Sequence, residues 1–430
     1  MSLDLDSPNR GNGSDVVAAA FGTTKARANE AGGTRGARAS SRPSLLVPLV
    51  LGATALLAGV TVGGLIKLWP HGPAPRVSGI TAVKTNGAVV ESIVAKRCSD
   101  LGLDTCFRVG VKLLDGPDKG TATTVWVGKS TGYTSFSVGD HLRVFRNPPP
   151  PAGYSGPSVG RYSFSDYDRR IPMAWLAAVF VILLILGSRL AGVRALVGLG
   201  ASLALVVFFV IPSILAAHSA LAVALVGSLA VLLVTIPLSY GLGPKAIAAW
   251  LGTALSLFFA VGLAALFTHL THLTGTTSEQ AVTLATSDDR VSLHGLLLAG
   301  MIVGALGVLV DLTVSQASTV IALRRANRSL GFGGLFRAAL GVGHDHIAAT
   351  VNTLVFAYAG AALPTLLIFS VGGSSFTDAI NSEAVAGEVV ATLVGAIALI
   401  VSMPLTTALA AVLATRMADR RLGADAGHAH

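Results

Sequence analysis

Eight long apolar stretches dominate the chain, and short polar segments separate them. Each stretch has roughly 20 residues, the length that an α-helix needs to cross the hydrocarbon core of a bilayer. Only one of them contains a charged residue, Asp311. The pattern therefore predicts a predominantly α-helical fold built on an eight-span transmembrane bundle. The stretches are residues 44–66, 171–188, 195–217, 219–240, 246–267, 296–321, 347–371 and 389–415.

The pattern changes between the first and the second apolar stretch. Residues 70–170 contain short β-rich runs, such as 88–94 and 106–114, which Gly, Asp and Pro turns separate. Five or six strands in about 90 residues favour a small β-barrel, and an OB-like barrel is the first choice. A linker rich in Gly and Pro begins at Pro148 and leads to the second span.

The ends of the chain have a different character from the spans. Residues 1–43 are rich in Gly, Ser, Ala, Asn and Arg and have no hydrophobic period, which predicts a disordered tail. Residues 44–69 are predicted to be an uncleaved signal-anchor helix, because no small-residue cleavage site follows Trp69. Residues 171–415 would form a seven-helix membrane domain, and 416–430 a second tail.

The distribution of Lys and Arg predicts the orientation of the spans, because these residues gather in short cytoplasmic loops. With the amino terminus inside, the short inner segments carry ten basic residues and the short outer loops carry one, Arg290. We therefore expect both termini in the cytoplasm and residues 70–170 outside it. The ten inner residues are Arg189, Arg194, Lys245, Arg324, Arg325, Arg328, Arg337, Arg416, Arg420 and Arg421.

Composition supports a membrane protein and excludes several other classes. The chain is 52% hydrophobic and 12% charged, whereas soluble domains are about 25% charged. The net charge of +9 follows from the topology, so nucleic acid is not an expected partner. No P-loop, nucleophile elbow, zinc-protease motif or dinucleotide fingerprint is present, so we expect no enzyme activity and no cofactor.

The two cysteines, Cys98 and Cys106, both lie in the predicted β domain. In an oxidising compartment outside the cytoplasm they can form a disulfide. Two separate thiols are the alternative, because pairing depends on a geometry that spacing does not define.

Asp311 is the most informative single residue. A carboxylate deep in a span costs at least about 2.5–3.5 kcal/mol, so it normally faces a bundle interior or a water-filled cavity. Ser315 lies one turn further along the same helical face and extends the polar stripe towards the cytoplasm. The alternative is an Asp that only joins helices by hydrogen bonds.

A second polar cluster, His344-Asp345-His346, precedes the seventh apolar stretch, inside which Asn352 and Thr353 follow. Asp311 lies roughly 15–18 Å from the cytoplasmic end of its helix, so the two polar stripes can meet in the inner half of the bundle. Imidazole and carboxylate groups suit proton relay near neutral pH. A metal site is a weaker reading. Asp345 can alternatively cap the start of a helix.

Two further segments invite interpretation. Residues 331–341 mix apolar bulk with Arg337, which predicts a short helix in the inner interface or a re-entrant elbow. Histidines and acids gather at the predicted outer mouth, where a cation site is conceivable, although histidines at helix ends are the commoner case. They are His269, His272, Asp288, Asp289 and His294.

The assembled segments resemble the YibE/F family of bacterial multi-pass membrane proteins over roughly residues 70–415. Two positions depart from the family pattern, which often has an acidic pair at Val310-Asp311 and a basic residue at His344. The resemblance implies a plasma-membrane protein, a candidate transporter without an assigned substrate. The segments that carry it are 162–169, 295–307 with Asp311, 315–318, 344–353, 357–360, 381–383 and 404–407.

These observations support three functional hypotheses. The first is a proton- or ion-coupled secondary transporter of an unknown small molecule or ion, with the lipid bilayer as its environment. The second is a membrane scaffold that binds an envelope partner through residues 70–170. The third is an intramembrane metal-dependent enzyme that uses His344, His346 and Asp311. The expected pathway residues are Asp311, Ser315, Gln316, His344, Asp345, His346, Asn352 and Thr353.

Overall fold

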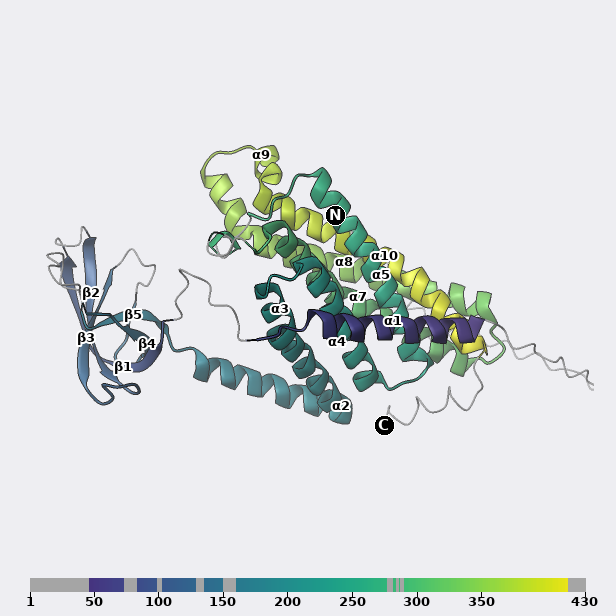
Figure 1. The fold of residues 1–430 in the computed structure, drawn as a ribbon, viewed down its shortest axis with the longest axis horizontal. Helices are drawn as coiled ribbons and strands as arrows, with labels where there is room; N and C mark the ends of the chain where they lie inside the picture. Colours follow the sequence, from purple (N-terminus) through teal and green to yellow (C-terminus); the bar gives the residue numbers. More distant parts are fainter. Residues whose placement is uncertain are drawn as a thin grey trace, which may run out of the picture. The chain divides into compact units, whose positions relative to one another are not determined.

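The fold combines a small antiparallel sheet with a set of long helices, as the computed structural model in Figure 1 shows. Both expected tails lie outside the described residues, apart from the last residue of the final helix. Most of the linker after Pro148 also lies outside them, as do Asp288 and Asp289. The structure describes residues 46–72, 83–98, 103–128, 135–149, 160–276, 281–283, 286 and 290–416.

Five strands form the sheet, in the order β3-β2-β1-β4-β5, and every pair of neighbours is antiparallel. A register shift between Val90 and Ser92 bends the long first strand, and such bulges increase the local twist of a sheet. The sheet curls into a half-barrel. The strands are β1 (Thr85–Cys98), β2 (Leu103–Leu113), β3 (Ala122–Gly128), β4 (His141–Arg146) and β5 (Tyr162–Tyr167).

Alternating residues of these strands form the core of the β domain. On β2, for example, Val109, Val111 and Leu113 are buried, and on β4 Leu142 and Val144 are. This period of two is what a sheet with one covered face requires. The runs 88–94 and 106–114, predicted as strands, thus contribute alternate residues to this core.

The two cysteines lie on neighbouring strands. The register pairs Lys96 with Cys106 and Cys98 with Leu103, so Cys98 and Cys106 are not directly opposite one another. Their side chains lie outside the described part of the chain. The disulfide stays a prediction.

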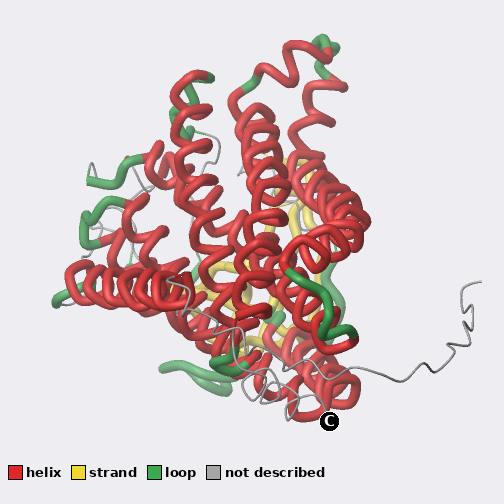
Figure 2. The backbone as a smooth tube through the Cα atoms, turned by 90° about the vertical axis from the view of Figure 1, so that its right-hand side faces the viewer, coloured by secondary structure: helices red, strands yellow, loops and turns green. Residues whose placement is uncertain are grey.

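Seven helices in the described residues are long and apolar enough to cross a membrane. One of these seven, Arg170–Leu215, is a continuous run of three elements, α2, η4 and α3. Figure 2 shows how closely the helices pack side by side. The helical elements are α1 (Leu46–Leu68), α2 (Arg170–Leu205), the π-helical turn η4 (Val206–Val210), α3 (Ile211–Leu215), α4 (Ala220–Tyr240), α5 (Pro244–Leu270), α7 (Leu293–Ala326), α8 (Phe332–Val371), α9 (Phe376–Asn381) and α10 (Glu383–Arg416).

The count is seven and not eight because two predicted spans fall within one helical run, Arg170–Leu215. A sharp break lies inside this run. Arg189 has φ 51° and ψ −129°, outside the helical region. A Cβ at Gly192 would lie only 2.6 Å from the carbonyl oxygen of Leu184, so the chain folds back tightly here. The predicted spans 171–188 and 195–217 lie on either side of this break.

The centre of the bundle is formed by α5, α7 and α10. Small and hydroxyl side chains allow their close approach: the hydroxyl oxygens of Thr253 on α5 and Thr313 on α7 are 2.5 Å apart. A Cβ at Gly252 would collide with Thr406 of α10. Close contacts of this kind are typical of helix packing in lipid. As a result α7, which carries Asp311, is held on two sides.

Helix α8 begins earlier than the sequence predicted. It is continuous from Phe332 to Val371, with Gly331 at its amino-terminal cap. Residues 331–341 therefore form no separate interfacial helix or elbow. Asp345 lies more than three turns inside α8, so the alternative interpretation of this residue as a helix cap was wrong.

Candidate functional site

The structure brings Asp311 of α7 and His346 of α8 together. The Nε2 atom of His346 lies 3.7 Å from the Oδ2 atom of Asp311. This Nε2 atom is shielded from solvent and has no hydrogen-bond partner in the described structure. The distance exceeds that of a direct hydrogen bond. The structure thus places an imidazole and a carboxylate from two helices next to each other.

Asp311 is more open than expected for an acid in a bundle interior, since 71% of its side chain is exposed. Its helical face also carries Gly300, Gly304 and Gly307, and all three are exposed. These three glycines leave the Asp311 face of α7 without side chains over that length. Asp311 lies on the surface of α7, with His346 as its neighbour on α8.

A further polar residue lies near Asp311 on the side of α4. Tyr240, the last residue of α4, is within electrostatic reach of Asp311. The Nζ atom of Lys245, at the start of α5, lies 4.5 Å from the centroid of the Tyr240 ring, a cation–π distance. Polar groups therefore extend from Asp311 towards the α4–α5 connection.

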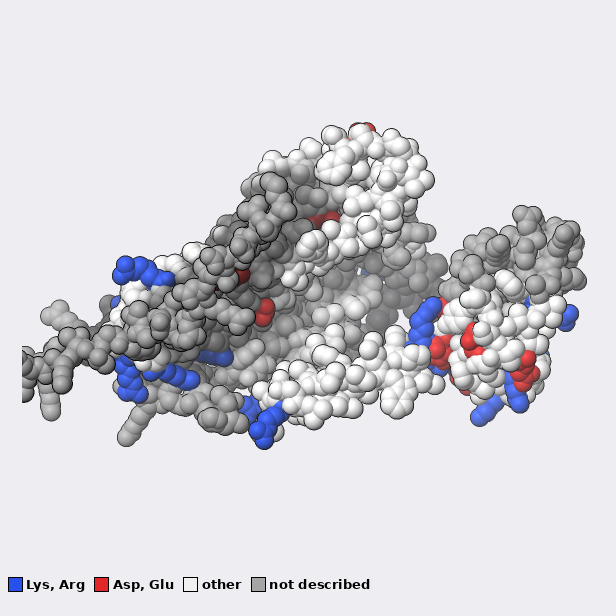
Figure 3. All heavy atoms as spheres, turned by 180° about the vertical axis from the view of Figure 1, so that it is seen from behind, with Lys and Arg blue, Asp and Glu red and all other residues white. Residues whose placement is uncertain are grey.

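Figure 3 shows that Lys and Arg side chains gather towards one end of the helices, while acidic side chains along their length are few.

Gln316 lies on the buried side of α7, away from Asp311. Its exposure is 2%. Its amide nitrogen donates hydrogen bonds of 2.8 Å to the Ala339 carbonyl of α8 and to the Thr407 hydroxyl of α10. A Cβ at Gly343 would lie 2.9 Å from the Gln316 Oε1 atom. Gln316 thus holds three helices together, which positions His346 relative to Asp311.

The other predicted pathway residues are not joined to Asp311. His344, Asp345, Asn352 and Thr353 are exposed on α8, and the Thr353 hydroxyl donates to the carbonyl of Ala349 on its own helix. Within the described ranges, no hydrogen bond or ion pair links them to Asp311. Ser315 is half-buried, one turn beyond Asp311.

A metal centre finds no support in this geometry. Among the residues that the structure describes, no group of three or more His, Cys, Asp or Glu side chains is arranged to hold a metal ion. His294 at the expected outer mouth instead places its Nδ1 atom 2.9 Å from the carbonyl oxygen of Leu273.

Glu388 has no role in the sequence analysis, because the last predicted span begins one residue after it. The structure places it more than one turn inside α10, half-buried, with Tyr358 of α8 nearby. These two residues line two cavities of about 260 and 360 Å³. The helix start at Glu383 was the missing information, because it moves Glu388 from a loop into the bundle.

Glu383 itself has a structural role. Its carboxylate accepts hydrogen bonds from the backbone nitrogens of Thr274, Gly275 and Thr276, at 2.7, 2.6 and 3.2 Å. The hydroxyls of both threonines also donate to it. It thereby fastens the start of α10 to the segment after α5.

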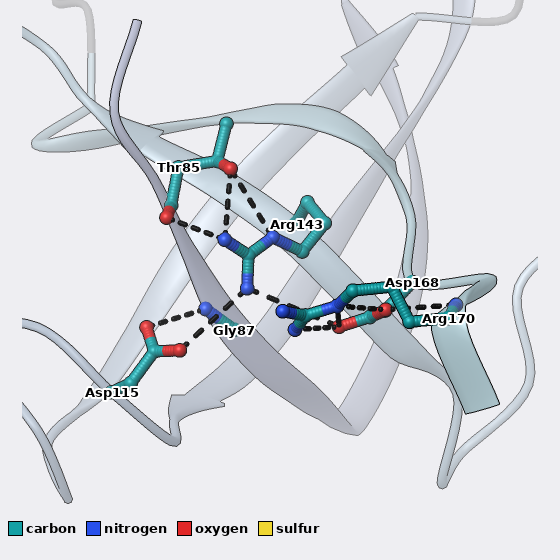
Figure 4. A network of polar contacts seen from close by, with 6 residues as sticks. All are labelled: Thr85, Gly87, Asp115, Arg143, Asp168 and Arg170. Carbon is teal, nitrogen blue, oxygen red and sulfur yellow. Dashed lines mark hydrogen bonds and ion pairs between the residues drawn. The ribbon is translucent and has the colours of Figure 1, made fainter. Parts of the chain in front are cut away.

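A polar network lies between the sheet and the start of α2 (Figure 4). Asp168 accepts from the Arg170 guanidinium, with the closest atoms 2.5 Å apart, and Arg143 of β4 lies 3.9 Å from the same carboxylate. The hydrogen bond from Arg170 is the main reason why the pKa of Asp168 falls from 3.8 to about 2. Arg143 also donates a hydrogen bond of 2.6 Å to the Thr85 carbonyl. Charged groups thus secure the residues around this junction.

The long apolar helices and the acidic positions within them define a multi-pass helical membrane protein. The family model described as YibE/F-like protein matches residues 176–416, more than half of the chain, so this chain belongs to the YibE/F-like family. No curated protein and no solved structure matches the chain.

The family match confirms the resemblance seen in the sequence, over a shorter range. It begins at residue 176, so the β domain and the segment 162–169 lie outside it. It includes Asp311, His346 and Glu388. The membrane helices, rather than the sheet, therefore carry the family relationship.

Proposed function

We propose that this protein is a proton-coupled secondary transporter of the bacterial plasma membrane, and that Asp311 and His346 form its proton-exchanging pair. The observation that carries the proposal is the 3.7 Å approach of these two side chains, on two different helices, within an otherwise uncharged stretch of α7. The substrate is a small molecule or ion that the sequence does not identify.

The chemistry follows from the two groups. When His346 takes up a proton, the resulting imidazolium attracts the Asp311 carboxylate, which favours a closed arrangement of α7 and α8. When the proton leaves, a neutral imidazole faces the carboxylate and that attraction is lost. A substrate with different affinities for the two arrangements would then be coupled to proton movement.

The proposed topology keeps eight spans, with the break at Arg189 dividing α2 into two of them. Arg189 and Arg194 would then lie at an inner turn, in agreement with the positive-inside rule. Both termini lie in the cytoplasm in this arrangement, and residues 70–170 lie outside it. The strand order is compatible with an OB-like barrel, which we propose for the β domain.

The test compares small-molecule and ion contents of cells that lack the protein with those of cells that carry wild type, Asp311→Asn or His346→Gln. We expect the cellular content of at least one solute to change when the wild type is present and not when either variant is. Transport of that solute into proteoliposomes should be driven by an imposed pH gradient. Asp378→Asn is the matched control, because Asp378 is an exposed acid on α9. Undiminished coupled flux in Asp311→Asn would overturn the proposal.

A scaffold function is the second candidate, and one feature of the sheet favours it. Trp126 on β3 is 39% exposed, and the Arg108 guanidinium lies 5.9 Å from its ring centroid. Exposed aromatic and Arg side chains are typical of binding surfaces. If this candidate is right, cells that carry the protein without residues 76–165 behave like cells that lack it. Cells that carry Asp311→Asn then behave like those with the wild type.

A further inference from the structure

A half-buried carboxyl group lies between α7, α8 and α10, at the opposite end of the exposed glycine face of α7 from His346. Glu388 of α10 lines a cavity of about 260 Å³ together with Tyr358 of α8 and Gly300 of α7. It also lines a second cavity of about 360 Å³, which again includes Tyr358. Glu388 therefore has space on two sides, in a region made mostly of apolar side chains.

The neighbours of Glu388 supply almost no polar partner. From α7 the cavities are lined by Leu296, Leu297, Gly300 and Met301, and from α9 by Phe376 and Ile380. The titratable group facing Glu388 from these elements is the Tyr358 phenol of α8. The Thr392 hydroxyl, one turn along α10, donates to the backbone carbonyl of Glu388. Within the described structure, no hydrogen bond or ion pair reaches the Glu388 carboxylate.

This donor set fits a proton better than a metal ion. Calcium requires six to eight oxygen ligands, and magnesium requires near-octahedral coordination. The smaller cavity offers three side-chain oxygens, two from Glu388 and one from Tyr358. A carboxyl group in such surroundings is neutralised most simply by binding one proton, because its charged form is costly among apolar side chains.

The glycine face of α7 connects Glu388 to Asp311. A Cβ at Gly304 would lie 2.7 Å from the Tyr358 hydroxyl, so the phenol rests directly against the α7 backbone. Gly300, beside Glu388, is eleven residues before Asp311, a separation of roughly 16 Å along a helix. On α8, Tyr358 is twelve residues after His346, or about 18 Å. The distance between the Glu388 region and the Asp311–His346 pair is thus nearly the same along α7 and along α8.

We propose that Glu388, with Tyr358 beside it, is a second proton-binding site, paired along the α7 glycine face with the Asp311–His346 site. This inference rests on the proposed proton-coupled function and extends it. A proton bound by the Glu388 carboxylate is released into the path along Gly304 and Gly307 and reaches Asp311 through water. Only a proton moves, so no bond other than O–H is broken or formed.

The test is chemical labelling of the full-length protein in lipid with dicyclohexylcarbodiimide, which attacks protonated carboxyl groups in apolar surroundings. Mass spectrometry would locate the modified residue. We expect labelling of Glu388 at pH 6 and at least about a tenfold fall at high pH, since each pH unit above the midpoint lowers the protonated fraction about tenfold. Glu383, whose carboxylate is occupied by hydrogen bonds, is the internal control and should remain unlabelled.

The outcomes separate the two proposals. Labelling of Glu388 in both wild type and Asp311→Asn supports the second site, even if transport proves independent of Asp311. If Asp311→Asn abolishes coupled flux while Glu388 is unlabelled at every pH in folded protein, the second site is refuted and the proposed function stands. Glu388→Gln must remove the label, and it should lower coupled flux at least about tenfold if the site lies on the proton path.

Discussion

The amide nitrogen of Gln316 on α7 lies 2.8 Å from the hydroxyl of Thr407 on α10 and also donates to the Ala339 carbonyl of α8. One side chain thus joins three helices at a buried point. Interhelical hydrogen bonds in membrane proteins contribute about 0.6 kcal/mol on average and up to about 1.7.

Gln316→Leu should therefore lower the free energy of unfolding by about 1–2 kcal/mol, because two hydrogen bonds are lost together. Thermal unfolding in detergent measures the change. Ser318→Ala is the control on the same helix, since its hydroxyl donates to the Val314 carbonyl of its own helix. Equal effects of the two substitutions would argue against a special role of Gln316.

His346→Gln should reduce coupled flux by roughly 10²-fold, the lower end of what a positioned acid–base group contributes to proton transfer. Glutamine keeps hydrogen-bonding atoms at similar positions but does not exchange protons near neutral pH. Flux under an imposed pH gradient gives the answer. A variant that retains wild-type coupling would show that Asp311 acts without its neighbour.

Gly304→Ala and Gly307→Ala form a matched pair on one face of α7. The new Cβ at 304 would meet the Tyr358 hydroxyl at 2.7 Å, whereas nothing lies within 4 Å at 307. We expect the first substitution to displace the phenol and lower coupled flux several-fold, and the second to leave flux nearly unchanged. Comparable losses in both would indicate that the path itself, rather than Tyr358, is sensitive to added volume.

Glu383→Ala should loosen the connection between the start of α10 and the segment after α5. The carboxylate accepts from three backbone nitrogens and two hydroxyls, so its removal leaves several donors without a partner. Because this site is partly exposed, we expect a loss of about 1–2 kcal/mol. Hydrogen exchange of residues 274–276 should increase, and unchanged protection would count against this role.

The junction between the sheet and α2 should weaken in acid. The pKa of Asp168 is lowered from 3.8 to about 2, chiefly by the hydrogen bond from Arg170. A carboxylate with a lowered pKa stabilises the folded state above its unfolded pKa, and this contribution disappears as the pH falls from about 4 to about 2. Asp168→Asn should remove that part of the pH dependence in unfolding experiments, whereas Glu91→Gln, an exposed position on β1, should not.

The helices and strands were predictable because each follows a simple hydrophobic period. Apolar length identified the spans, and β-rich runs between turn residues identified strands such as the one that contains Val109 and Val111. That the polar stripes of α7 and α8 can meet also followed from sequence, but the particular pair, Asp311 with His346, is known only from the structure.

Other features depend on where elements begin and how they break, which composition does not reveal. The residues before His344 were predicted to form an interfacial segment because they mix apolar bulk with Arg337, yet α8 continues through them. Glu388 lies outside the predicted span 389–415, whereas α10 already starts at Glu383. The side of α7 on which Gln316 packs depends on contacts with two other helices, so its structural role was not visible in the sequence.

The turn at Arg189 has a consequence for how the chain enters the membrane. A residue with φ 51° and ψ −129° adopts a backbone that glycine would tolerate with less strain. An arginine at this point therefore lowers local stability. In return it places a positive charge at the turn between the two halves of α2. In the proposed arrangement that charge resists translocation, so the two arms would insert together with their tip left behind.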